Sequence, residues 1–386
     1  MKRQKLIILM TVLVDVIGFG IVIPILPFYV SEFGASALMV TVLFATYSVC
    51  SFLSSPFLGA LSDRIGRRPV LLFSIASTAV GWFVFASAAA LPLLFIGRII
   101  DGLAAGNFSI AQSYLVDLAK DEKDRTANIG LLGAAFGIGF TLGPVIGGTL
   151  SKFSHATPFY FAGALATLNV IVAYFTLPET NFNRSTAKIT YHPFAPIRRA
   201  LQAKSIHPML LTWIAFAVAQ VISQSLFALF TQRVFGFSSF TTGMLFTSLG
   251  IIIVINQAAL LKRFWLPNFS DGQLDVLMFS ILAVAVVMIA SMQEWLFFLS
   301  LPLLGTGQGI LRTAITSRTA GAVDPTMKGE TLGILSSLMS VAMAVVPVAA
   351  GVLFEMHPSI PYFLSGAVLL SGIYFSRLTP SNSPAS

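Results

Sequence analysis

Charge is what this chain of 386 residues has least of, because only 10% of its residues are Asp, Glu, Lys or Arg. A typical soluble domain has about 25% charged residues. Hydrophobic residues make up 56% of the chain, and phenylalanine alone occurs 34 times. This composition excludes an ordinary soluble domain, and the single cysteine, Cys50, excludes an intrachain disulfide.

Several signatures of chemistry are also missing. No GxxxxGK[ST] stretch occurs that would cradle a nucleotide phosphate. The histidines do not have metal-ligand spacing, and no nucleophile shares an apolar segment with a plausible base; the histidines are His155, His192, His207 and His357. We therefore expect no enzyme activity, no metal site and no cofactor.

What the sequence does contain is long apolar segments. Twelve of them are long enough to cross a hydrocarbon core of about 30 Å. Gly and Pro inside them do not argue against helix, because transmembrane helices tolerate both. The segments are 5–30, 37–60, 69–89, 92–116, 128–150, 157–177, 208–231, 240–261, 274–292, 295–317, 331–353 and 360–377. They predict an all-α membrane protein with twelve transmembrane helices.

Lys and Arg are distributed unevenly between the two sides of these segments. If both termini are cytoplasmic, the outer side holds only Lys152 and Arg233, whereas nearly all other basic residues fall on the inner side. Such a bias orients membrane proteins and suits contact with anionic inner-leaflet lipid. We predict a protein of the plasma membrane, the inner membrane of a bacterium. Because the basic residues are spread over short segments, we expect no nucleic-acid partner.

The longest polar connection, 178–206, divides six apolar segments from six. Its part 193–204 is either an amphipathic helix on the inner surface or a plain linker. A shift of 203 residues superimposes the two halves, and it aligns Gly102 with Gly305, Gly106 with Gly309, Arg125 with Lys328, Gly130 with Gly333, Pro144 with Pro347 and Gly148 with Gly351. The sequence thus predicts an N-terminal six-helix bundle (1–177), a cytoplasmic linker (178–206) and a C-terminal six-helix bundle (207–386).

The turn between the second and third segments is rich in charge. It reads GALSDRIGRRP (59–69), and its notable residues are Gly59, Asp63, Arg64, Gly66, Arg67 and Arg68. The glycines would relieve crowding in a tight turn. The aspartate would interact with a helix N-terminus or pair with an arginine, forming a latch that exists only while the two halves are close at the inner face. The alternative is a solvated loop that follows the positive-inside rule.

Three further stretches accompany this turn: DVIGFGIVIPILPFY (15–29), GRIIDGLAAG (97–106) and GAAFGIGFTLGPVIGG (133–148). On these four motifs the chain resembles a major facilitator superfamily transporter over essentially its whole length. It is most similar to the twelve-helix drug/proton antiporters, particularly the tetracycline-exporter-like branch. The resemblance implies two pseudo-symmetric six-helix bundles, a small-molecule substrate and alternating access around a site near the membrane midplane.

The fifth segment contains the stretch that in this superfamily marks antiporters. Its glycines, together with Gly133 and Gly137, create faces on which another helix can pack closely, and Pro144 allows a bend. The residues concerned are Gly139, Gly143, Pro144, Gly147 and Gly148. The segment can serve as a gate or as ordinary helix packing, and the two interpretations are compatible.

Ionisable residues within apolar segments are the sharper evidence, since they usually face a cavity or a partner. Such residues are Asp15, Arg98, Asp101 and Arg312. We predict that Asp101, or as second choice Asp15, gains and loses a proton as access alternates, and that Arg98 sets its proton affinity. The alternative is a structural salt bridge from Arg98 to either carboxylate.

Arg312 has a serine, Ser109, at the corresponding position of the first half, so duplication does not explain it. It would bind an anionic group of a substrate by bidentate hydrogen bonds or pair with an acidic residue. Further substrate-binding candidates are Arg98, Gln112, Gln224, Asn256, Gln308 and Phe136. Each glutamine and asparagine can equally well join helices.

The predicted function is proton-coupled export of a small organic compound by a monomeric antiporter, with the proton gradient as the energy source. Tetracycline exporters are expected to have further acids in the third and ninth helices, whereas STAVGWFVFA and LMFSILAVAVVMIA contain none; this argues against tetracycline as substrate. One alternative is an exporter of an anionic metabolite, such as a carboxylate siderophore or a lipid-like amphiphile. Another is a non-transporting membrane sensor or scaffold.

Overall fold

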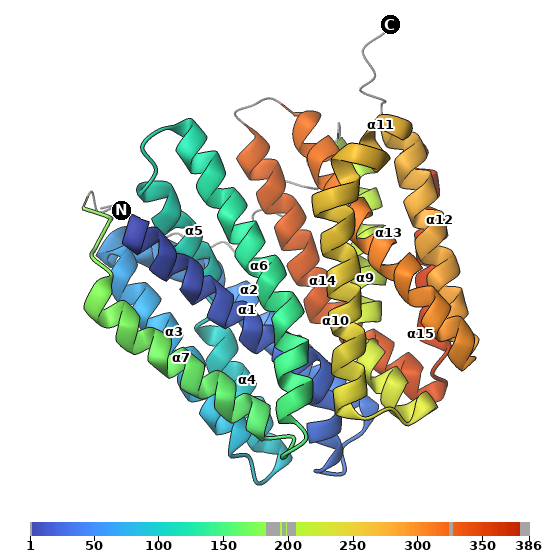
Figure 1. Cartoon of the computed structure of the whole chain (residues 1–386), viewed down its shortest axis with the longest axis horizontal. Coiled ribbons are helices and arrows are strands. Elements are labelled where there is room, and N and C mark those ends of the chain that lie inside the picture. The colour runs from blue at the N-terminus through green and yellow to red at the C-terminus, as the bar shows by residue number, and fades with distance from the viewer. Residues whose placement is uncertain (1, 183–193, 195–197, 199–205, 324–326, 379–386) are drawn as a thin grey trace, which may run out of the picture. The chain divides into compact units, whose positions relative to one another are not determined.

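The computed structural model describes residues 2–182, 194, 198, 206–323 and 327–378, and every regular element in these ranges is a helix (Figure 1). The helices are α1 (Lys2–Ser31), α2 (Ala37–Ile65), α3 (Arg67–Ala86), α4 (Leu91–Leu103), α5 (Asn107–Asp117), α6 (Glu122–Leu150), α7 (Thr157–Thr176), α9 (His207–Phe235), α10 (Ser239–Ile255), the π-helix η2 (Asn256–Trp265), α11 (Leu266–Asn268), α12 (Asp271–Ala290), α13 (Glu294–Gly321), α14 (Lys328–Met356) and α15 (Ile360–Arg377). The prediction of an all-α chain is confirmed.

In the described ranges, 10 helical segments are long and apolar enough to span a membrane. The predicted fourth and eighth segments are each interrupted, because α4 ends before Gly106 and α10 continues as a π-helix. Helices α13 and α15 match the predicted segments 295–317 and 360–377 but are not among the 10. Polar residues such as Gln308 and Arg312 in α13 and Arg377 in α15 lower their mean hydropathy.

The chain forms two compact units. Unit 1 comprises Met1–Pro193 and Phe237–Thr247, and unit 2 comprises Phe194–Gly236 and Ser248–Ser386. This division differs from the predicted one, because the first half of α10 groups with unit 1. The stretch 193–204, for which an amphipathic surface helix and a plain linker were both open, lies outside the described residues except for 194 and 198.

Unit 1 has an apolar core near the ends of its helices, in which α1, α3, α5 and α7 meet. Ile8, Leu71, Tyr114 and Leu115 are fully buried there. Helix α1 also packs along α6, and α3 packs on α4 and α7. Burial of this kind brings polar residues of α1, α3, α5 and α7 into one interior.

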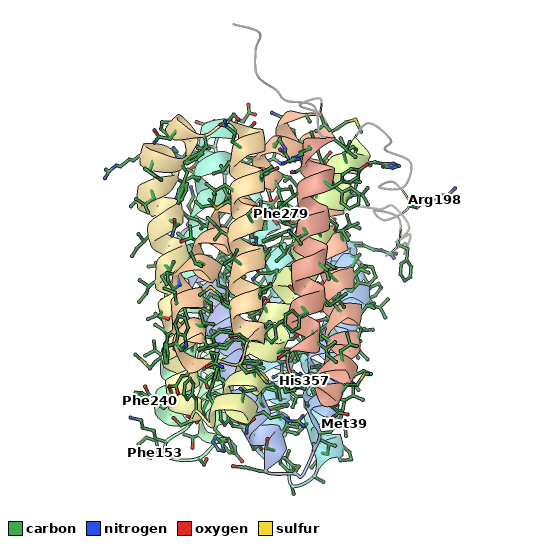
Figure 2. The ribbon with its side chains drawn as sticks, turned by 90° about the vertical axis from the view of Figure 1, so that its right-hand side faces the viewer. Met39, Phe153, Arg198, Phe240, Phe279 and His357 are labelled. Carbon is green, nitrogen blue, oxygen red and sulfur yellow. The ribbon has the colours of Figure 1, made fainter. Side chains whose placement is uncertain are left out.

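Unit 2 is built around α9, which packs on α14 and α15. Its contact with α14 is lined by small and apolar residues, among them Ala217, Val221 and Ala342. Helix α12 packs on α13 and α15, and its Phe279 is fully buried against the position of Gly372 (Figure 2). The closely packed interior of unit 2 is therefore largely apolar.

Candidate functional site

A buried cluster of charge lies in unit 1, and close packing of α3 on α4 positions it. A Cβ atom at Gly81 would lie 3.1 Å from the backbone nitrogen of Asp101, which is tighter than most such contacts, so glycine favours this close approach. Arg98 and Asp101 are 4% and 7% exposed, and their charged groups are 3.6 Å apart, one helical turn from each other. An ion pair of Arg98 with Asp101, which the sequence analysis gave as the alternative to a proton-carrying Asp101, is thus present.

Aromatic rings surround the Arg98 guanidinium. Its central carbon lies 4.6 Å from the ring centre of Phe85, 4.8 Å from that of Trp82 and 5.9 Å from that of Tyr47. Cation–π attraction is stronger where the cation is desolvated. Nε and Nη2 of Arg98 have no hydrogen-bond partner among the described residues, so the rings and Asp101 together hold this cation.

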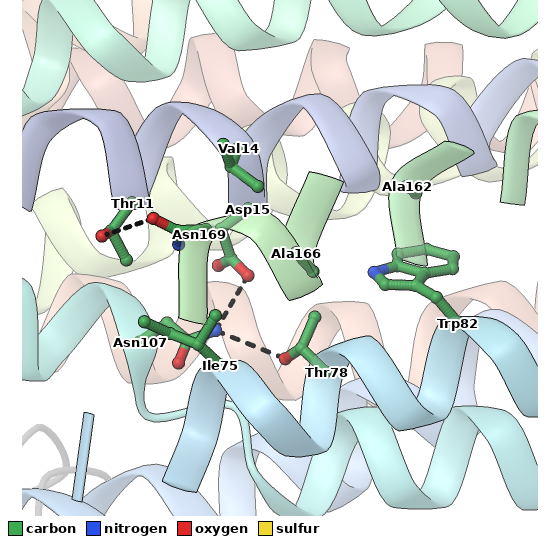
Figure 3. A pocket seen from close by; sticks show the side chains of 10 residues that line it. All are labelled: Thr11, Val14, Asp15, Ile75, Thr78, Trp82, Asn107, Ala162, Ala166 and Asn169. Carbon is green, nitrogen blue, oxygen red and sulfur yellow. Dashed lines mark hydrogen bonds between the residues drawn. The ribbon is translucent and has the colours of Figure 1, made fainter. Parts of the chain in front are cut away.

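The second candidate carboxylate, Asp15, belongs to the same cluster. Asn107 Nδ2 donates to Asp15 Oδ1 at 2.9 Å and to Thr78 Oγ1 at 3.3 Å (Figure 3). The Thr78 side chain is also close to the carboxylate of Asp101, which interacts electrostatically with Asp15. The two carboxylates therefore belong to one buried polar cluster with Asn107 and Thr78.

Sequence reasoning missed the two connecting residues. Asn107 follows directly after GRIIDGLAAG, and Thr78 lies in the third apolar segment. The signal that could have found them is a polar residue inside an apolar segment, but many such residues only join helices.

The cluster contains two carboxylates and one guanidinium, so it has one negative charge when all three groups are ionised. An uncompensated charge in a buried site is costly, and one proton would remove it. The arrangement is suited to taking up and releasing one proton. No group of three or more potential metal ligands occurs in the described ranges.

The other substrate-binding candidates are described within their own units, and those of unit 1 lie outside this cluster. Gln112 is exposed, and Phe136 stacks on Phe140 with ring centres 6.1 Å apart. In unit 2, Gln224 and Gln308 are partly buried, and Arg312 is exposed with no ion pair among the described residues. The predicted acidic partner of Arg312 is therefore not found in this part of the chain.

Asn256 is held by its own surroundings. Its Nδ2 donates to Ile252 O at 2.9 Å and Thr306 Oγ1 at 3.1 Å, and its Oδ1 accepts from Trp265 Nε1 at 3.0 Å. With these bonds made, the side chain joins α10, η2 and α13. This favours the helix-joining alternative over substrate binding.

Unit 2 has a buried acid that the sequence analysis overlooked. Asp275 lies in α12, and its Oδ2 is 2.5 Å from Nη2 of Arg318 in α13. The side chains of Asp275 and Arg318 are only 1% and 4% exposed. The expectation that the ninth helix lacks an acid is therefore wrong, because the quoted stretch began after Asp275. Of the two helices compared with the tetracycline exporters, only the third lacks an acid.

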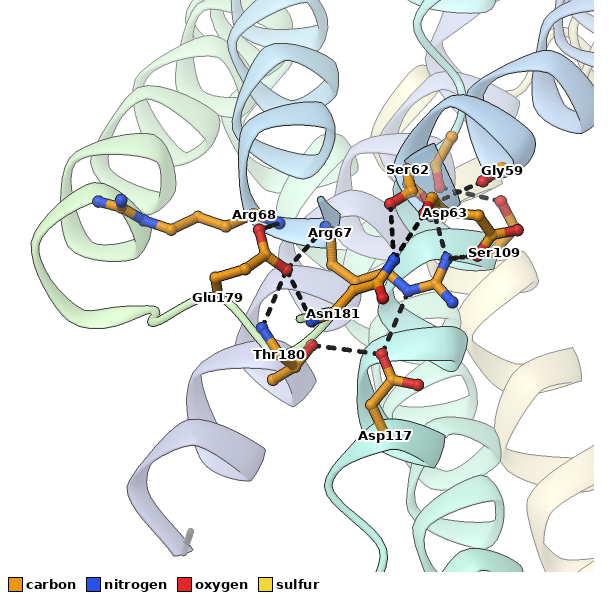
Figure 4. A network of polar contacts seen from close by, with 11 residues as sticks. Gly59, Ser62, Asp63, Arg67, Arg68, Ser109, Asp117, Glu179, Thr180 and Asn181 are labelled. Carbon is orange, nitrogen blue, oxygen red and sulfur yellow. Dashed lines mark hydrogen bonds and ion pairs between the residues drawn. The ribbon is translucent and has the colours of Figure 1, made fainter. Parts of the chain in front are cut away.

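The charged turn between α2 and α3 forms a network within unit 1 (Figure 4). Arg67 Nη1 lies 2.5 Å from Asp63 Oδ1, and Arg67 Nε lies 3.2 Å from Asp117 Oδ2 of α5. Asp63 thus pairs with an arginine, as one of the predicted alternatives required. Its side chain is half exposed, and Arg64 is exposed.

The N-terminus of α3 is capped by a residue from a distant segment. Glu179 Oε1 accepts from Arg67 N at 2.9 Å and Glu179 Oε2 accepts from Arg68 N at 3.2 Å. Gly66 has φ +116°, and a side chain there would collide with the Glu179 carboxylate. A side chain at Gly59, by contrast, would meet open space, so the predicted crowding at Gly59 is wrong.

Glycines of α6 contact α1 on one face only. A side chain at Gly143 would lie 2.7 Å from the Cα of Gly20, and one at Gly139 would lie 2.9 Å from Val16. Gly147 faces Ile21 and Ile25 of α1. Gly148, about one helical turn after Pro144, faces Phe240 and Gly243 at the start of α10. Gly133 and Gly137 face open space, so they are not part of a packing face.

Comparison with known proteins agrees with this architecture. Residues 8–271 match the family model of the Major Facilitator Superfamily. The chain belongs to the Major Facilitator Superfamily. The class E tetracycline resistance protein of Escherichia coli is 30% identical over 365 residues, which cover 92% of this chain and 89% of that protein. The quinolone resistance protein NorA of Staphylococcus aureus is 26% identical over 382 residues, which cover 97% of this chain and 95% of that protein.

Solved structures show the same fold. A bacterial homologue of the human lysosomal transporter Spinster, in an inward-facing and occupied conformation, matches with a TM-score of 0.76 at 15% identity, covering 99% of this chain and 98% of that chain. The human organic anion transporter MFSD10 matches with a TM-score of 0.71 at 22% identity, covering 97% of this chain and 99% of that chain. This superfamily member is an integral membrane transporter for a small molecule, of the drug-exporter-like kind, and not an enzyme.

Proposed function

We propose that this transporter exports a small organic compound from the cytoplasm in exchange for protons by alternating access. It works as a monomer in lipid with both termini cytoplasmic, and it needs no cofactor because the proton gradient supplies the energy. The membrane potential contributes about 2.3 kcal/mol per proton for each 100 mV. The kinship with tetracycline and quinolone resistance proteins supports a drug or drug-like metabolite as cargo.

The observation that carries the proposal is the buried cluster of Asp15, Asp101 and Arg98. Asn107 hydrogen bonds to Asp15 and Thr78, and Thr78 lies close to Asp101. The single excess negative charge of the cluster matches one proton. Loss of that proton leaves a buried anion that favours whichever conformation admits water to it. A cycle of protonation can in this way drive a cycle of access.

The test measures proton movement in lipid vesicles containing the purified protein and a trapped pH-sensitive dye. Tetracycline and a quinolone are added in turn, and the intact protein is compared with Asp101→Asn and Asp15→Asn. We expect drug-dependent proton flux in the intact protein and a loss in both variants, because each removes an acid of the pair. Drug transport without any proton flux in the intact protein would refute the proton coupling.

A second candidate function is export of an anionic metabolite. It is favoured by the exposed Arg312, which has no ion pair in the described part of the chain, since guanidinium groups bind carboxylates in bidentate fashion. Transport of a carboxylate compound should then fall strongly in Arg312→Ala, whereas Arg312→Lys should retain part of it. If neither variant affects any substrate, Arg312 is not a ligand. If no compound is moved at all, a sensor or scaffold becomes the better description.

A further inference from the structure

A small polar cavity lies inside unit 1, between α1, α3, α5 and α7 (Figure 3). Its wall combines apolar side chains with the Asp15 carboxylate, two asparagines and two threonines; the polar members are Thr11, Asp15, Thr78, Asn107 and Asn169. All of them belong to the same unit. The space admits water-sized molecules and is too small for an organic substrate.

Two buried polar atoms in this wall have no hydrogen-bond partner among the described residues. Asn107 Oδ1 and Asn169 Nδ2 are both without one, and their residues are only 3% and 6% exposed. Buried amide atoms in native proteins are nearly always paired with protein or with ordered water. One of these atoms is an acceptor and the other is a donor.

The remaining atoms of the two amides are already used. Asn107 Nδ2 is committed to Asp15 and Thr78, and Asn169 Oδ1 accepts from Thr11 Oγ1 at 3.1 Å. A cation would be repelled by the Asn169 N–H group, and an anion would be repelled by the Asp15 carboxylate. Water can accept from Asn169 and donate to Asn107 and Asp15, so water fits all three.

We propose that this cavity is a hydration site whose bound water passes protons to and from Asp15. The inference rests on the proposed proton coupling and adds the group that loads the acid. The bound water gives one proton to the Asp15 carboxylate, forming an O–H bond there, as it takes another proton from a hydronium ion outside the cavity, so that it remains water. The reverse step releases the proton to the same water.

The electrostatic surroundings of Asp15 suit this step. The charged and titratable groups that interact with it are Asp101 of α4 and Tyr47 of α2, with Arg98 paired to Asp101. None of these residues lines the cavity. The cavity therefore exchanges protons directly with Asp15, whereas Asp101 and Arg98 lie outside its wall.

The test replaces groups of the cavity wall that touch neither Asp101 nor Arg98. Asn169→Leu removes the unpaired donor and fills the space, and Ala166→Val fills it without removing any polar group. Thr167→Val is the matched control, because its hydroxyl bonds only to Gly163 O of its own helix at 2.8 Å and it does not line the cavity. All variants are first checked for thermal unfolding in detergent.

Two measurements are made on each variant. Drug-dependent proton flux in vesicles, with tetracycline or a quinolone, should fall about tenfold in Asn169→Leu and Ala166→Val, as expected when one buried hydrogen bond is lost. Thr167→Val should match the intact protein. The infrared C=O band of protonated Asp15, identified by its loss in Asp15→Asn, should shift in the two cavity variants because its water is displaced.

The outcomes separate this inference from the proposed function. An unchanged band together with unchanged flux in both cavity variants would overturn the hydration site. A shifted band in a protein that moves no protons with either drug would support the site and refute the proton-coupled function. If Asn169→Leu fails to fold, Ala166→Val still gives both readouts.

Discussion

The two units of this transporter share a duplicated pattern but fill it with different chemistry. At the positions of Arg98, Asp101 and Asn107, the repeat shift of 203 residues places Leu301, Leu304 and Ile310, all of them buried in unit 2. Conversely, Arg318 corresponds to Leu115, which is fully buried in the apolar core of unit 1. The duplication thus kept the helices and some of their glycines, while the buried charges of the two units lie at positions that do not correspond.

The helix contacts differ in the same way. Gly139 and Gly143 of α6 correspond to Ala342 and Val346 of α14, which pack on α9 with ordinary side-chain contacts. Because a glycine contact brings backbones closer than an alanine or valine contact does, α1 and α6 lie nearer to each other than side chains would permit. Each difference between the units can be tested by giving one unit the residue of the other.

The largest effect is expected from Arg98→Leu, which gives unit 1 the residue found at Leu301. It leaves Asp101 as an uncompensated buried charge, and breaking a buried pair in this way costs about 3–5 kcal/mol. The double variant Arg98→Leu/Asp101→Leu, which copies both residues of the ion pair from unit 2, should recover most of the stability. Thermal unfolding in detergent measures both, and vesicle assays should show no proton flux in either.

A double variant that is no more stable than Arg98→Leu would contradict this account. It would mean that the aromatic rings around Arg98, rather than the ion pair with Asp101, hold the site together.

The opposite exchange concerns the ion pair of unit 2. Arg318→Leu gives it the residue found at Leu115 and leaves Asp275 unpaired, so we expect a loss of about 3–5 kcal/mol here too. Asp275→Leu/Arg318→Leu should be close to the intact protein in its unfolding midpoint, because apolar packing often replaces a buried pair without cost. Arg312→Leu, on the same helix but exposed, is the control and should change stability little.

An intermediate effect is expected from Gly143→Val, which copies Val346 into the contact of α1 with α6. The new side chain would overlap the backbone of Gly20, and overpacking costs about 1–3 kcal/mol. Gly137→Val is the matched control, since it adds the same β-branched residue to the same helix in open space. Equal unfolding midpoints for the two variants would show that α1 and α6 do not need their close approach.

A smaller effect is expected at the N-termini of α3 and α12, which occupy corresponding places in the two units but are capped differently. Helix α12 is capped by its own Ser270 and Gln273, whereas α3 depends on the remote Glu179. Glu179→Ala should cost about 1 kcal/mol, the usual loss of a helix cap, and slow transport.

Asp63→Asn should impair transport while leaving insertion and orientation intact, with less loss of stability because Asp63 is half exposed.

If Asp63→Asn transports at the normal rate, the turn is only a topology signal. A Glu179→Gln variant with normal stability would indicate that the cap needs an acceptor oxygen and not a charge.

The smallest effect concerns Lys5 and Asp124, which join α1 to α6 at 2.7 Å, whereas the corresponding positions of unit 2 are Pro208 and Met327. The hydrogen bond from Lys5 lowers the pKa of Asp124, with a further contribution from the backbone of Lys120. A carboxyl group whose pKa is lower in the folded protein stabilises the fold. This stabilisation is fully present above the ordinary carboxyl pKa of about 3.9, and it is lost as the pH falls through the lowered pKa of the folded protein. The unfolding midpoints of the intact protein and Asp124→Asn should therefore differ at neutral pH and converge in acid. High salt should reduce the difference.

Much of this architecture follows from local properties of the chain. Apolar length predicts the helices because each must satisfy its backbone hydrogen bonds within itself, and the four motifs identify the superfamily. Individual residues within a motif also indicated the acids Asp15 and Asp101. These properties depend on a few neighbouring residues, so they can be recognised without knowing which helices meet.

Other features depend on contacts between distant segments, and only the tertiary structure decided them. The hydrogen bonds from Asn107 bring Asp15 and Thr78 together, the cap of α3 requires Glu179, and the pair in unit 2 requires Asp275 near Arg318. Likewise, only the packing shows that Gly139, Gly143 and Gly147 of α6 face α1, whereas Gly133 and Gly137 face open space. The physical reason is that burial and pairing belong to the packed arrangement of helices, whereas the sequence alone specifies only the helices that pack.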